Sequence, residues 1–312
     1  MGNHQPILSI CIPIYNRLNY LEKMLARFTE DKDLFEEQIH LFISDNCSED
    51  DLQACCEKYS GEGLKIEYVR NEENIGADKN FEQCFARGKG KYTWLLGSDD
   101  IPVRGYLRKL LGMLSAKDYG LFHLSLKKMK EENLKEFVDC NNMLEDININ
   151  LTFMSSNIVA SDKIRVVDLA QYRNTNLIQI CAYLTACTES ELNAVSYLGN
   201  PFEPGSDIAN NGGFNFYRVF VENFYKILND FVGVGKLNTE ALERVKRKEF
   251  KNYLCRFFVR YNLLHLPNNY DFTDSSKILK ENYGFRWYIV WDILTYPIGV
   301  FHRKVRKELF MR

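Results

Sequence analysis

The sequence predicts an open α/β sheet flanked by helices and followed by a mainly helical region. Apolar strands and amphipathic helices alternate four times in the first 115 residues, which indicates parallel strands joined by right-handed helical crossovers. Each strand ends abruptly in polar residues, and the carboxyl ends of such strands are where α/β sheets bind their ligands. From residue 214 onward, apolar and aromatic residues recur at helical spacing instead.

The first strand is expected over residues 7–14, a continuous apolar run with β-branched residues that suits burial on both faces. A helix starts at Asn16 and carries leucines at helical spacing. The same pattern then repeats, with strands over 39–44, 64–69 and 92–96 and helices over 52–59, 77–87 and 104–114. Ser48 is expected to cap the helix over 52–59, with Asp51 three residues later.

The second half of the chain has a weaker pattern. Residues 119–126 are interpreted as a strand and 155–159 as a short strand or a loop. A helix is expected after Asp168, where Leu177, Ile180 and Leu184 share one face. A loop rich in Gly, Pro and Asn covers 199–213. Two amphipathic aromatic helices are expected over 214–231 and 239–264, and Pro267 follows the second.

Composition excludes several classes of protein. At 312 residues and 46% hydrophobic, the chain buries a core of ordinary size, and 40 basic against 42 acidic residues give no general reason to expect a nucleic-acid partner. Nine cysteines without a Cys-x-x-Cys pair indicate reduced core thiols, which favours a cytoplasmic setting. The N-terminus shows no secretory signal pattern.

The C-terminal segment 286–312 differs from the rest. Trp287 to Phe301 is almost wholly apolar and aromatic, but it is shorter than the roughly 20 residues that span a bilayer. Six basic residues against Asp292 and Glu308 give a local balance of +4. This composition predicts an interfacial anchor on anionic lipid at the inner face of the cell membrane. The alternative is a packed C-terminal helix with a basic, solvated tail.

Asp99 and Asp100 are the first candidates for chemistry. They follow an apolar strand, so they place carboxylate oxygens at the edge of the predicted sheet, where a divalent cation can neutralise a diphosphate. The alternative for this pair is a solvated turn that caps the next helix. The surrounding motifs decide between the two.

Four motifs stand in a defined order: Ile12-Pro13-Ile14-Tyr15-Asn16, Ser44 to Asp50, Asn74-Ile75-Gly76 with Asn80, and Ser98-Asp99-Asp100. In this order the chain resembles family 2 of the inverting glycosyltransferases over residues 7 to about 115. The resemblance implies the GT-A fold, with a sugar-nucleotide donor and Mg²⁺ or Mn²⁺. It also implies a GT-A domain over 1–213, divided into a nucleotide-binding half (1–115) and an acceptor half (116–213), and a helical C-terminal region over 214–312.

The resemblance assigns roles to single residues. Pro13 and Tyr15, with Asn16, match the positions that pack the nucleobase and ribose, where an aromatic ring is a good platform for a base. Asp45 matches the acid that accepts hydrogen bonds from uracil or ribose. Asn74 and Gly76 match the turn through which the backbone approaches the nucleotide.

The acidic motif departs from the family pattern. Asp99 and Asp100 match its metal-binding part, and Asp99 also matches a nucleotide contact, but the family's first Asp is replaced by Gly97. Two carboxylates are therefore left to serve the metal and the ribose together. How they divide these roles stays open at this point.

The implied reaction is attack of an acceptor hydroxyl on the anomeric carbon of the donor, which displaces a nucleoside diphosphate with inversion. A carboxylate should remove the acceptor proton, and the family places this base in the second half of the domain, often in a Glu-Asp pair. This chain has no clean copy of that pair. The candidates are Asp168, Glu189, Glu191, Glu203 and Asp207.

The sequence therefore predicts a metal-dependent glycosyltransferase that uses a UDP-sugar and acts on a glycan or a lipid-linked oligosaccharide in bacterial surface polysaccharide synthesis. Two alternatives remain. A sugar nucleotidyltransferase is expected to carry a Gly-rich, basic loop after the first strand, and Pro13 to Arg17 is not such a loop. A catalytically inactive, membrane-associated scaffold with the same fold is consistent with Gly97 and the missing base motif.

Overall fold

The computed structural model describes residues 5–127, 133–204, 213–284, 286 and 289–296. The chain forms two compact units, residues 1–209 and 210–312. The expected tail 286–312 and the candidate base Asp207 lie wholly or largely outside the described residues.

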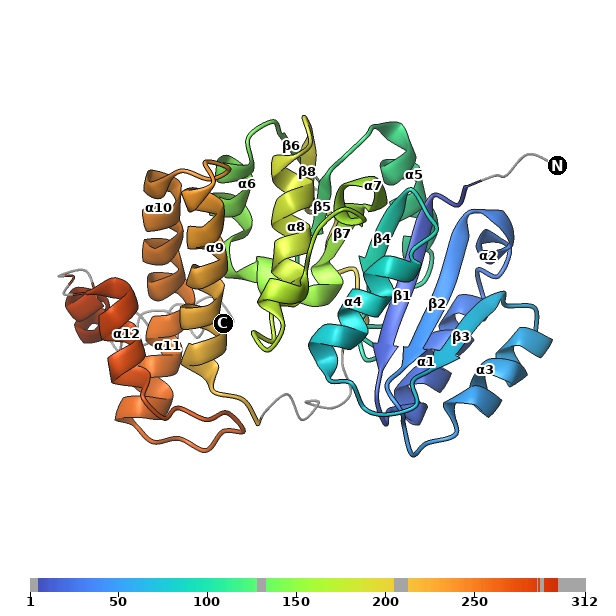
Figure 1. The fold of residues 1–312 in the computed structure, drawn as a ribbon, viewed down its shortest axis with the longest axis horizontal. Coiled ribbons are helices and arrows are strands. Elements are labelled where there is room, and N and C mark those ends of the chain that lie inside the picture. Colours follow the sequence, from blue (N-terminus) through green and yellow to red (C-terminus); the bar gives the residue numbers. More distant parts are fainter. Residues whose placement is uncertain (1–4, 128–132, 205–212, 285, 287–288, 297–312) are drawn as a thin grey trace, which may run out of the picture. The chain divides into compact units, whose positions relative to one another are not determined.

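Unit 1 is built on one mixed sheet of eight strands in the order β3-β2-β1-β4-β7-β5-β8-β6 (Figure 1). Neighbouring strands are parallel from β3 to β4, whereas β7 is antiparallel to both of its neighbours and β6 is antiparallel to β8. The strands are β1 (Leu8–Ile14), β2 (Ile39–Asp45), β3 (Ile66–Arg70), β4 (Tyr92–Leu95), β5 (Leu121–Leu124), β6 (Leu134–Phe137), β7 (Asn157–Ala160) and β8 (Asn193–Ser196). This arrangement confirms the predicted sheet flanked by helices.

Helices cover both faces of the sheet. One face of β1, including Leu8 and Ile10, packs in the main core with α1 (Leu18–Thr29), α3 (Leu52–Gly61) and α5 (Tyr106–Ala116). Two further helices, α4 (Ala77–Arg87) and α8 (Ile178–Thr188), pack against β1 and β7, respectively, and against each other (Figure 1). Because β1 is covered on both faces, its continuous apolar sequence is explained.

The remaining elements of unit 1 are short. They are α2 (Leu34–Glu37), α6 (Cys140–Ile147), α7 (Ser161–Ile164) and the 3₁₀ turns η1 (Asn148–Thr152), η2 (Met154–Ser156) and η3 (Ala170–Tyr172). The helix α6 and the strand β8 were not predicted. A four-residue strand carries too few side chains to show a period of two.

Two predicted helix starts shift by a few residues. α1 begins at Leu18, whose backbone N–H donates to Oδ2 of Asp50 at 3.0 Å, and not at Asn16. α5 begins at Tyr106 because Gly105 precedes it with a φ of 73°, a left-handed conformation that glycine adopts readily. Both corrections concern the loops that follow strands of the parallel part of the sheet.

Unit 2 is helical, as predicted for the C-terminal region. Its elements are η4 (Arg218–Asn223), α9 (Phe224–Gly233), α10 (Thr239–Glu249), η5 (Phe250–Leu254), α11 (Cys255–Phe257), η6 (Phe258–Leu263) and α12 (Ser275–Tyr283), and residues 289–296 are also helical. The segments η4, η5 and η6 are π-helical, so the two long helices expected from the sequence are irregular. Within the described parts of the chain, no helix is long and apolar enough to cross a membrane.

Candidate functional site at the carboxyl ends of β1, β2 and β4

Asp45 ends β2 and is fully buried. Its Oδ1 accepts the backbone N–H of Ser48 at 2.9 Å, and its Oδ2 accepts the hydroxyl of Tyr68 at 2.6 Å. The Nε of Arg70, at the end of β3, lies 3.5 Å from the same Oδ2. Asp45 thus holds the loop after β2 and two side chains of β3, and it presents Tyr68 and Arg70 at the edge of the sheet.

Three asparagines fix the turn that precedes α4. The Nδ2 of Asn46 donates to Oδ1 of Asn74 at 2.8 Å, and Oδ1 of Asn46 accepts from the backbone N–H of Ile75 at 3.0 Å and from Nδ2 of Asn71 at 3.2 Å. Gly76 follows with a φ of 82° and serves as the N-cap of α4. The network brings Asn74 and Gly76 beside the loop after β2, as the motif order implied.

The roles of Ser48 and Asp51 differ from the prediction. Asp51 is the N-cap of α3, since its Oδ1 accepts the backbone N–H of Ala54 at 3.0 Å. The hydroxyl of Ser48 instead accepts the backbone N–H of Asn16 at 2.9 Å, and Oδ1 of Asn16 accepts the backbone N–H of Glu49 at 2.7 Å. Asn16, with a φ of 48°, therefore ties the end of β1 to the loop after β2.

Pro13 and Tyr15 lie at the carboxyl end of β1. Pro13 pairs in register with Ser44 of β2, and Tyr15 is the residue directly after the strand. The side chain of Tyr15 is 44% exposed, which is unusual for a large ring at the end of a buried strand. Ile14, the residue before it, pairs in register with Asp45, so the accessible ring of Tyr15 lies at the same edge of the sheet as Asp45.

The acidic pair follows β4 and folds back over Gly97. The backbone N–H of Asp100 donates to the carbonyl of Gly97 at 3.0 Å, and the hydroxyl of Ser155 donates to Oδ2 of Asp100 at 2.6 Å. A Cβ at position 97 would meet that Oδ2 at 2.8 Å and Oδ1 of Asp99 at 3.2 Å. The glycine that replaces the expected third acid therefore leaves room for the two carboxylates that remain.

Asp100, like Asp99, is partly buried. Burial raises its pKa to about 6, and the charge of Asp99 adds to this effect, whereas the hydrogen bond from Ser155 and the charge of Arg17 oppose it. A carboxyl group with a raised pKa is one that gains from a nearby cation. Asp99 already has such a partner, because Nη1 of Arg17 lies 3.1 Å from its Oδ1.

The donor set fits a divalent cation that is shared with a substrate. Magnesium in sugar-nucleotide and ATP sites is held by one or two carboxylates together with phosphate oxygens and waters. The described residues contain no group of three or more His, Cys, Asp or Glu side chains that could hold a metal by themselves. Asp99 and Asp100 therefore suit a cation that takes its remaining ligands from outside the protein.

Sequence reasoning missed three residues of this site: Arg17, Arg70 and Ser155. Arg17 follows the Tyr15-Asn16 motif directly, and β1 lies next to β4 in the sheet, so the strand order places it against Asp99. Arg70 ends the strand beside β2. These two positions were open to inference from the predicted topology, whereas Ser155 comes from a 3₁₀ turn that the sequence did not reveal.

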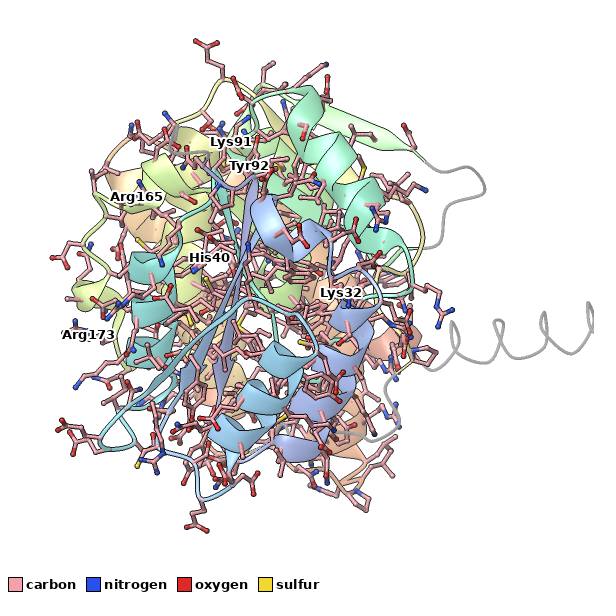
Figure 2. The ribbon with its side chains drawn as sticks, turned by 90° about the vertical axis from the view of Figure 1, so that its right-hand side faces the viewer. Lys32, His40, Lys91, Tyr92, Arg165 and Arg173 are labelled. Carbon is pink, nitrogen blue, oxygen red and sulfur yellow. The ribbon has the colours of Figure 1, made fainter. Side chains whose placement is uncertain are left out.

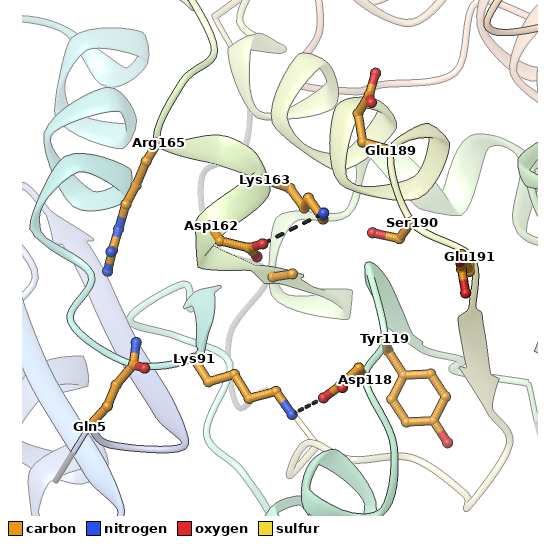
Figure 3. A pocket seen from close by; sticks show the side chains of 11 residues that line it. Gln5, Lys91, Asp118, Tyr119, Asp162, Lys163, Arg165, Glu189, Ser190 and Glu191 are labelled. Atoms are coloured by element: carbon orange, nitrogen blue, oxygen red, sulfur yellow. Dashed lines mark hydrogen bonds and ion pairs between the residues drawn. The ribbon is translucent and has the colours of Figure 1, made fainter.

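The candidate bases do not lie together. Glu189 and Glu191 line a pocket with Lys91, Asp118 and Lys163, at the edge where β4, β5 and β8 begin (Figure 3). Figure 2 shows Lys91 and Arg165 of the same pocket at this end of the unit. The acidic pair follows the opposite end of β4, so Glu189 and Glu191 do not share an edge of the sheet with it.

Asp168 and Glu203 also lie in different parts of the unit. Asp168 is exposed, and its Oδ1 accepts the backbone N–H of Ala170, the first residue of η3, at 2.9 Å. Glu203 lies beside the segment that follows the acidic pair, because its N–H donates to the carbonyl of Ile101 at 2.8 Å. Its carboxylate pairs with Arg27. Among the described candidates, Glu203 is the one that the fold brings near Asp100.

Comparison with known proteins gives a family. Residues 9–164, half of the chain, match the family model Glycosyl transferase family 2. Abequosyltransferase RfbV of Salmonella typhimurium is 37% identical over 112 residues, which cover 36% of this chain and 33% of the relative. The putative teichuronic acid biosynthesis glycosyltransferase TuaG of Bacillus subtilis is 31% identical over 111 residues, which cover 36% of this chain and 43% of TuaG.

Solved structures share the fold. A fragment of S. aureus TarS, residues 1–349 in complex with UDP, aligns with a TM-score of 0.57 and 17% identity over 81% of this chain and 74% of that chain. The same fragment in complex with UDP-GlcNAc aligns with a TM-score of 0.56. The matched sequence segments span less than half the length of RfbV and TuaG. The matched motifs, the mixed sheet and the family model agree: the chain belongs to glycosyl transferase family 2.

Proposed function

We propose that this protein transfers a sugar from a UDP-sugar to a hydroxyl group of a glycan or lipid-linked oligosaccharide, with inversion at the anomeric carbon. The observation that carries the proposal is the acidic pair Asp99–Asp100, which lies next to the end of β1 through the contact between Asp99 and Arg17. Tyr15, Asp45 and Arg70, which lie at the carboxyl ends of β1, β2 and β3, would bind the nucleoside. The diphosphate would then lie between the two.

A bound Mg²⁺ or Mn²⁺ would neutralise charge on the departing diphosphate. Asp99 and Asp100 would hold that cation, and Ser155 keeps the carboxylate of Asp100 in place through its 2.6 Å hydrogen bond. Arg17 contacts Asp99 through Nη1 and is partly exposed, and its planar guanidinium group would also contact phosphate oxygens. Release of UDP is favoured because its negative charge stays paired throughout the reaction.

The acceptor proton requires a base, and we propose Glu203. It follows Phe202, which bridges to Pro102, two residues after Asp100. Its partner Arg27 keeps the carboxylate in a defined position, as a proton acceptor needs. Asp207 in the same loop is the second candidate, and it lies outside the described residues.

The acceptor class is proposed from the relatives. RfbV is named as an abequosyltransferase and TuaG as a putative teichuronic acid biosynthesis enzyme, and TarS was solved with UDP and UDP-GlcNAc. These names support a role in bacterial surface polysaccharide synthesis of the capsule or O-antigen type. We further propose a cytoplasmic protein that is peripheral on the inner face of the membrane and contacts it through 286–312.

The test is thermal unfolding of the purified protein with nucleoside diphosphates and with UDP-, GDP- and dTDP-sugars, each with and without Mn²⁺. UDP and one UDP-sugar should raise the unfolding temperature by several degrees, and more with Mn²⁺ than without it. The Asp99→Ala and Asp100→Ala variants should lose the metal-dependent part of the shift. Glu203→Gln should keep the shift and lose sugar transfer.

Glu189→Gln is the matched control, since this acid lies at the opposite edge of the sheet, and it should behave as the parent protein does. Stabilisation by GDP or dTDP alone would reassign the donor. No response to any nucleotide would instead favour the catalytically inactive scaffold. Formation of a sugar nucleotide from a sugar phosphate and a nucleoside triphosphate would favour the nucleotidyltransferase.

A further inference from the structure

The turn over residues 151–156, which precedes β7 and contains η2, has four backbone carbonyls that buried side chains bind. They are the carbonyls of Leu151, Phe153, Met154 and Ser155. Asn157 of β7 donates to the first two, each at 2.9 Å, Tyr183 of α8 donates to the third at 3.3 Å, and Trp94 of β4 donates to the fourth at 2.8 Å. All three donors are fully buried. Carbonyls of a surface turn are usually solvated, whereas here the interior of the unit holds them.

This turn carries the residue that orients Asp100. The hydroxyl of Ser155 donates to Oδ2 of Asp100 at 2.6 Å and accepts the backbone N–H of Gly97 at 2.8 Å. A displacement of the turn would therefore move the hydroxyl of Ser155 away from the carboxylate of Asp100. The side chains that hold the turn thus also decide where this carboxylate lies.

Asn157 is itself held by a buried histidine. His123 of β5 lies directly opposite Asn157 in the antiparallel pair of β5 and β7, and its Nδ1 lies 2.8 Å from Oδ1 of Asn157. Because β5, β7 and β4 are neighbours in the sheet, this pair lies at the same edge as the acidic pair that follows β4 (Figure 1). Burial lowers the pKa of His123 to about 4, although its hydrogen bond with Asn157 opposes this. The imidazole is therefore neutral at the pH of the cytoplasm.

The hydrogen bonds determine which ring nitrogen carries the proton. Nδ2 of Asn157 is the atom that donates to the two carbonyls of the turn, so the atom that faces His123 is Oδ1, which can only accept. Nδ1 of His123 must therefore be the protonated nitrogen. This bond also fixes the amide of Asn157, since a flipped amide would turn its oxygen towards the two carbonyls and its donors towards the N–H of His123.

We propose that His123 and Asn157 are positioning residues for the acidic pair. Together they hold the turn 151–156 so that Ser155 keeps the carboxylate of Asp100 in the orientation that a divalent cation needs. Both side chains are buried, so they act through the turn and not through the substrate. The inference rests on the proposed role of Asp100 in metal binding, and it adds two residues that the reaction itself does not require. Residues that orient a metal ligand in this way change the affinity for the metal when they are replaced.

The first experiment compares two amide variants of His123 by isothermal titration of UDP with and without Mn²⁺. His123→Asn places an amide nitrogen near the position of Nδ1, and His123→Gln places one near Nε2, so the two variants differ in where the donor lies. His123→Asn should keep the Mn²⁺-dependent affinity within about twofold of the parent, and His123→Gln should weaken it about tenfold. UDP affinity without metal should change in neither variant. Equal affinities in the two variants would overturn the role of His123.

Asn193 provides a matched control for Asn157. It is also fully buried and also begins a strand, and its Nδ2 donates to the carbonyl of Cys187 at 3.1 Å, but that strand, β8, begins at the opposite edge of the sheet. Asn157→Asp loses the donors to the turn and should weaken Mn²⁺-dependent UDP binding about tenfold. Asn193→Asp should lower the unfolding temperature and leave this binding unchanged. A loss of binding in Asn193→Asp as large as that in Asn157→Asp would show general destabilisation and overturn the inference.

A measurement without any ligand separates this inference from the proposed function. The indole N–H of Trp94 donates to the carbonyl of Ser155, so its NMR signal reports the position of the turn. The chain has three tryptophans, and this signal is the one that disappears in Trp94→Phe. It should shift in Asn157→Asp and in His123→Gln, and it should stay in place in Asn193→Asp.

The two measurements together decide between the outcomes. An unchanged Trp94 signal in Asn157→Asp would overturn the inference whatever the result with UDP. If the signal shifts as expected but the parent protein shows no Mn²⁺-dependent UDP binding, the two residues hold the turn as inferred and the proposed metal site is rejected. If the signal shifts and the parent binds UDP with Mn²⁺, but Asn157→Asp binds it equally well, the turn does not position Asp100 and the inference is wrong.

Discussion

Ser155 connects the fold to the acidic pair through three contacts. Its hydroxyl accepts the backbone N–H of Gly97 at 2.8 Å and donates to Oδ2 of Asp100 at 2.6 Å, and its carbonyl accepts the indole N–H of Trp94 at 2.8 Å. Trp94 is fully buried in β4, so these contacts hold the carboxylate of Asp100 in a fixed position at the edge of the sheet. Residues that orient a ligand in this way are costly to replace.

We therefore predict that Ser155→Ala weakens Mn²⁺-dependent UDP binding about tenfold, because the Asp100 carboxylate loses its hydrogen-bond donor. UDP binding without metal should change far less. Isothermal titration of UDP at fixed Mn²⁺ measures both. Equal losses with and without Mn²⁺ would contradict a role through Asp100.

The neighbouring serine provides the control. Ser156 is also buried, but within the described residues its hydroxyl has no hydrogen-bond partner. Ser156→Ala makes the same Ser-to-Ala change but removes a hydroxyl without a hydrogen-bond partner, so it should leave UDP binding unchanged. Its stability should equal or exceed that of the parent.

At this scale the sequence predicted which candidate residues lie at the carboxyl ends of strands, but not the residues that hold them in place. Asp45, Asn74 and Asp99 could be predicted because each follows a strand and belongs to a motif of fixed order. Ser155 could not, since it is distant in sequence and comes from a turn with no periodic pattern. The geometry at Gly97 also depends on how the chain folds back after β4, which no local pattern reveals.

At the scale of elements, Asp78 joins α4 to α8. It lies in the first turn of α4, is largely buried, and its Oδ2 accepts the backbone N–H of Asn176 at 3.2 Å just before α8 begins. Burial raises the pKa of Asp78, and the backbone N–H groups of Asn176 and its neighbours oppose this effect. The carboxylate thus acts as a cap supplied by another helix.

Asp78→Ala should lower the free energy of unfolding by about 2 kcal/mol, because the first turn of α8 loses its acceptor in a buried place. Urea denaturation measures the change. Glu82→Ala is the control on the same helix, since Glu82 pairs with Arg173 at 2.9 Å on the surface, and should cost less than about 1 kcal/mol. Similar losses in both variants would contradict the capping role.

Helices and strands with a clear hydrophobic period could be predicted from the sequence, whereas short strands and irregular helices could not. α4 was predicted with its observed ends, because Gly76 and Gly88 flank a clear amphipathic pattern. The strands β6 and β8 contain four residues each, and their burial depends on partners far away in sequence. In unit 2, the π-helical segments keep aromatic residues such as Tyr253 at a spacing close to that of an α-helix, so the sequence could not distinguish them from α-helix.

At the scale of the whole molecule, the interior of unit 2 holds an ionisable group that links the stability of the fold to pH. Unit 2 buries Glu249 completely, where its Oε2 accepts the hydroxyl of Tyr225 at 2.7 Å, and Tyr225 in turn contacts the hydroxyl of Tyr283. Desolvation raises the pKa of Glu249 well above its usual value, although the hydrogen bond from Tyr225 and the charge of Lys246 oppose this. At a pH between the unfolded and the folded pKa, the folded state therefore holds a proton that the unfolded chain has released.

This difference gives the stability of unit 2 a pH dependence of known sign. Well below the ordinary glutamate pKa of about 4.3 both states hold the proton, so Glu249 adds no pH dependence to the stability there. As the pH rises further, the unfolded state loses its proton first, so the stability falls by up to about 1.4 kcal/mol for each pH unit until the folded pKa is reached. Glu249→Gln stays neutral in both states and removes this loss.

We expect Glu249→Gln to be more stable than the parent at pH 8 and to lose that advantage progressively towards pH 4, as measured by thermal unfolding of the full chain across this range. Glu243→Gln is the control, because Glu243 lies on the same helix but pairs with Arg286 at the surface. It should lose a little stability at pH 8 and show no gain there. A pH-independent difference between Glu249→Gln and the parent would mean that Glu249 is ionised in the fold, with Lys246 as the cation that balances it.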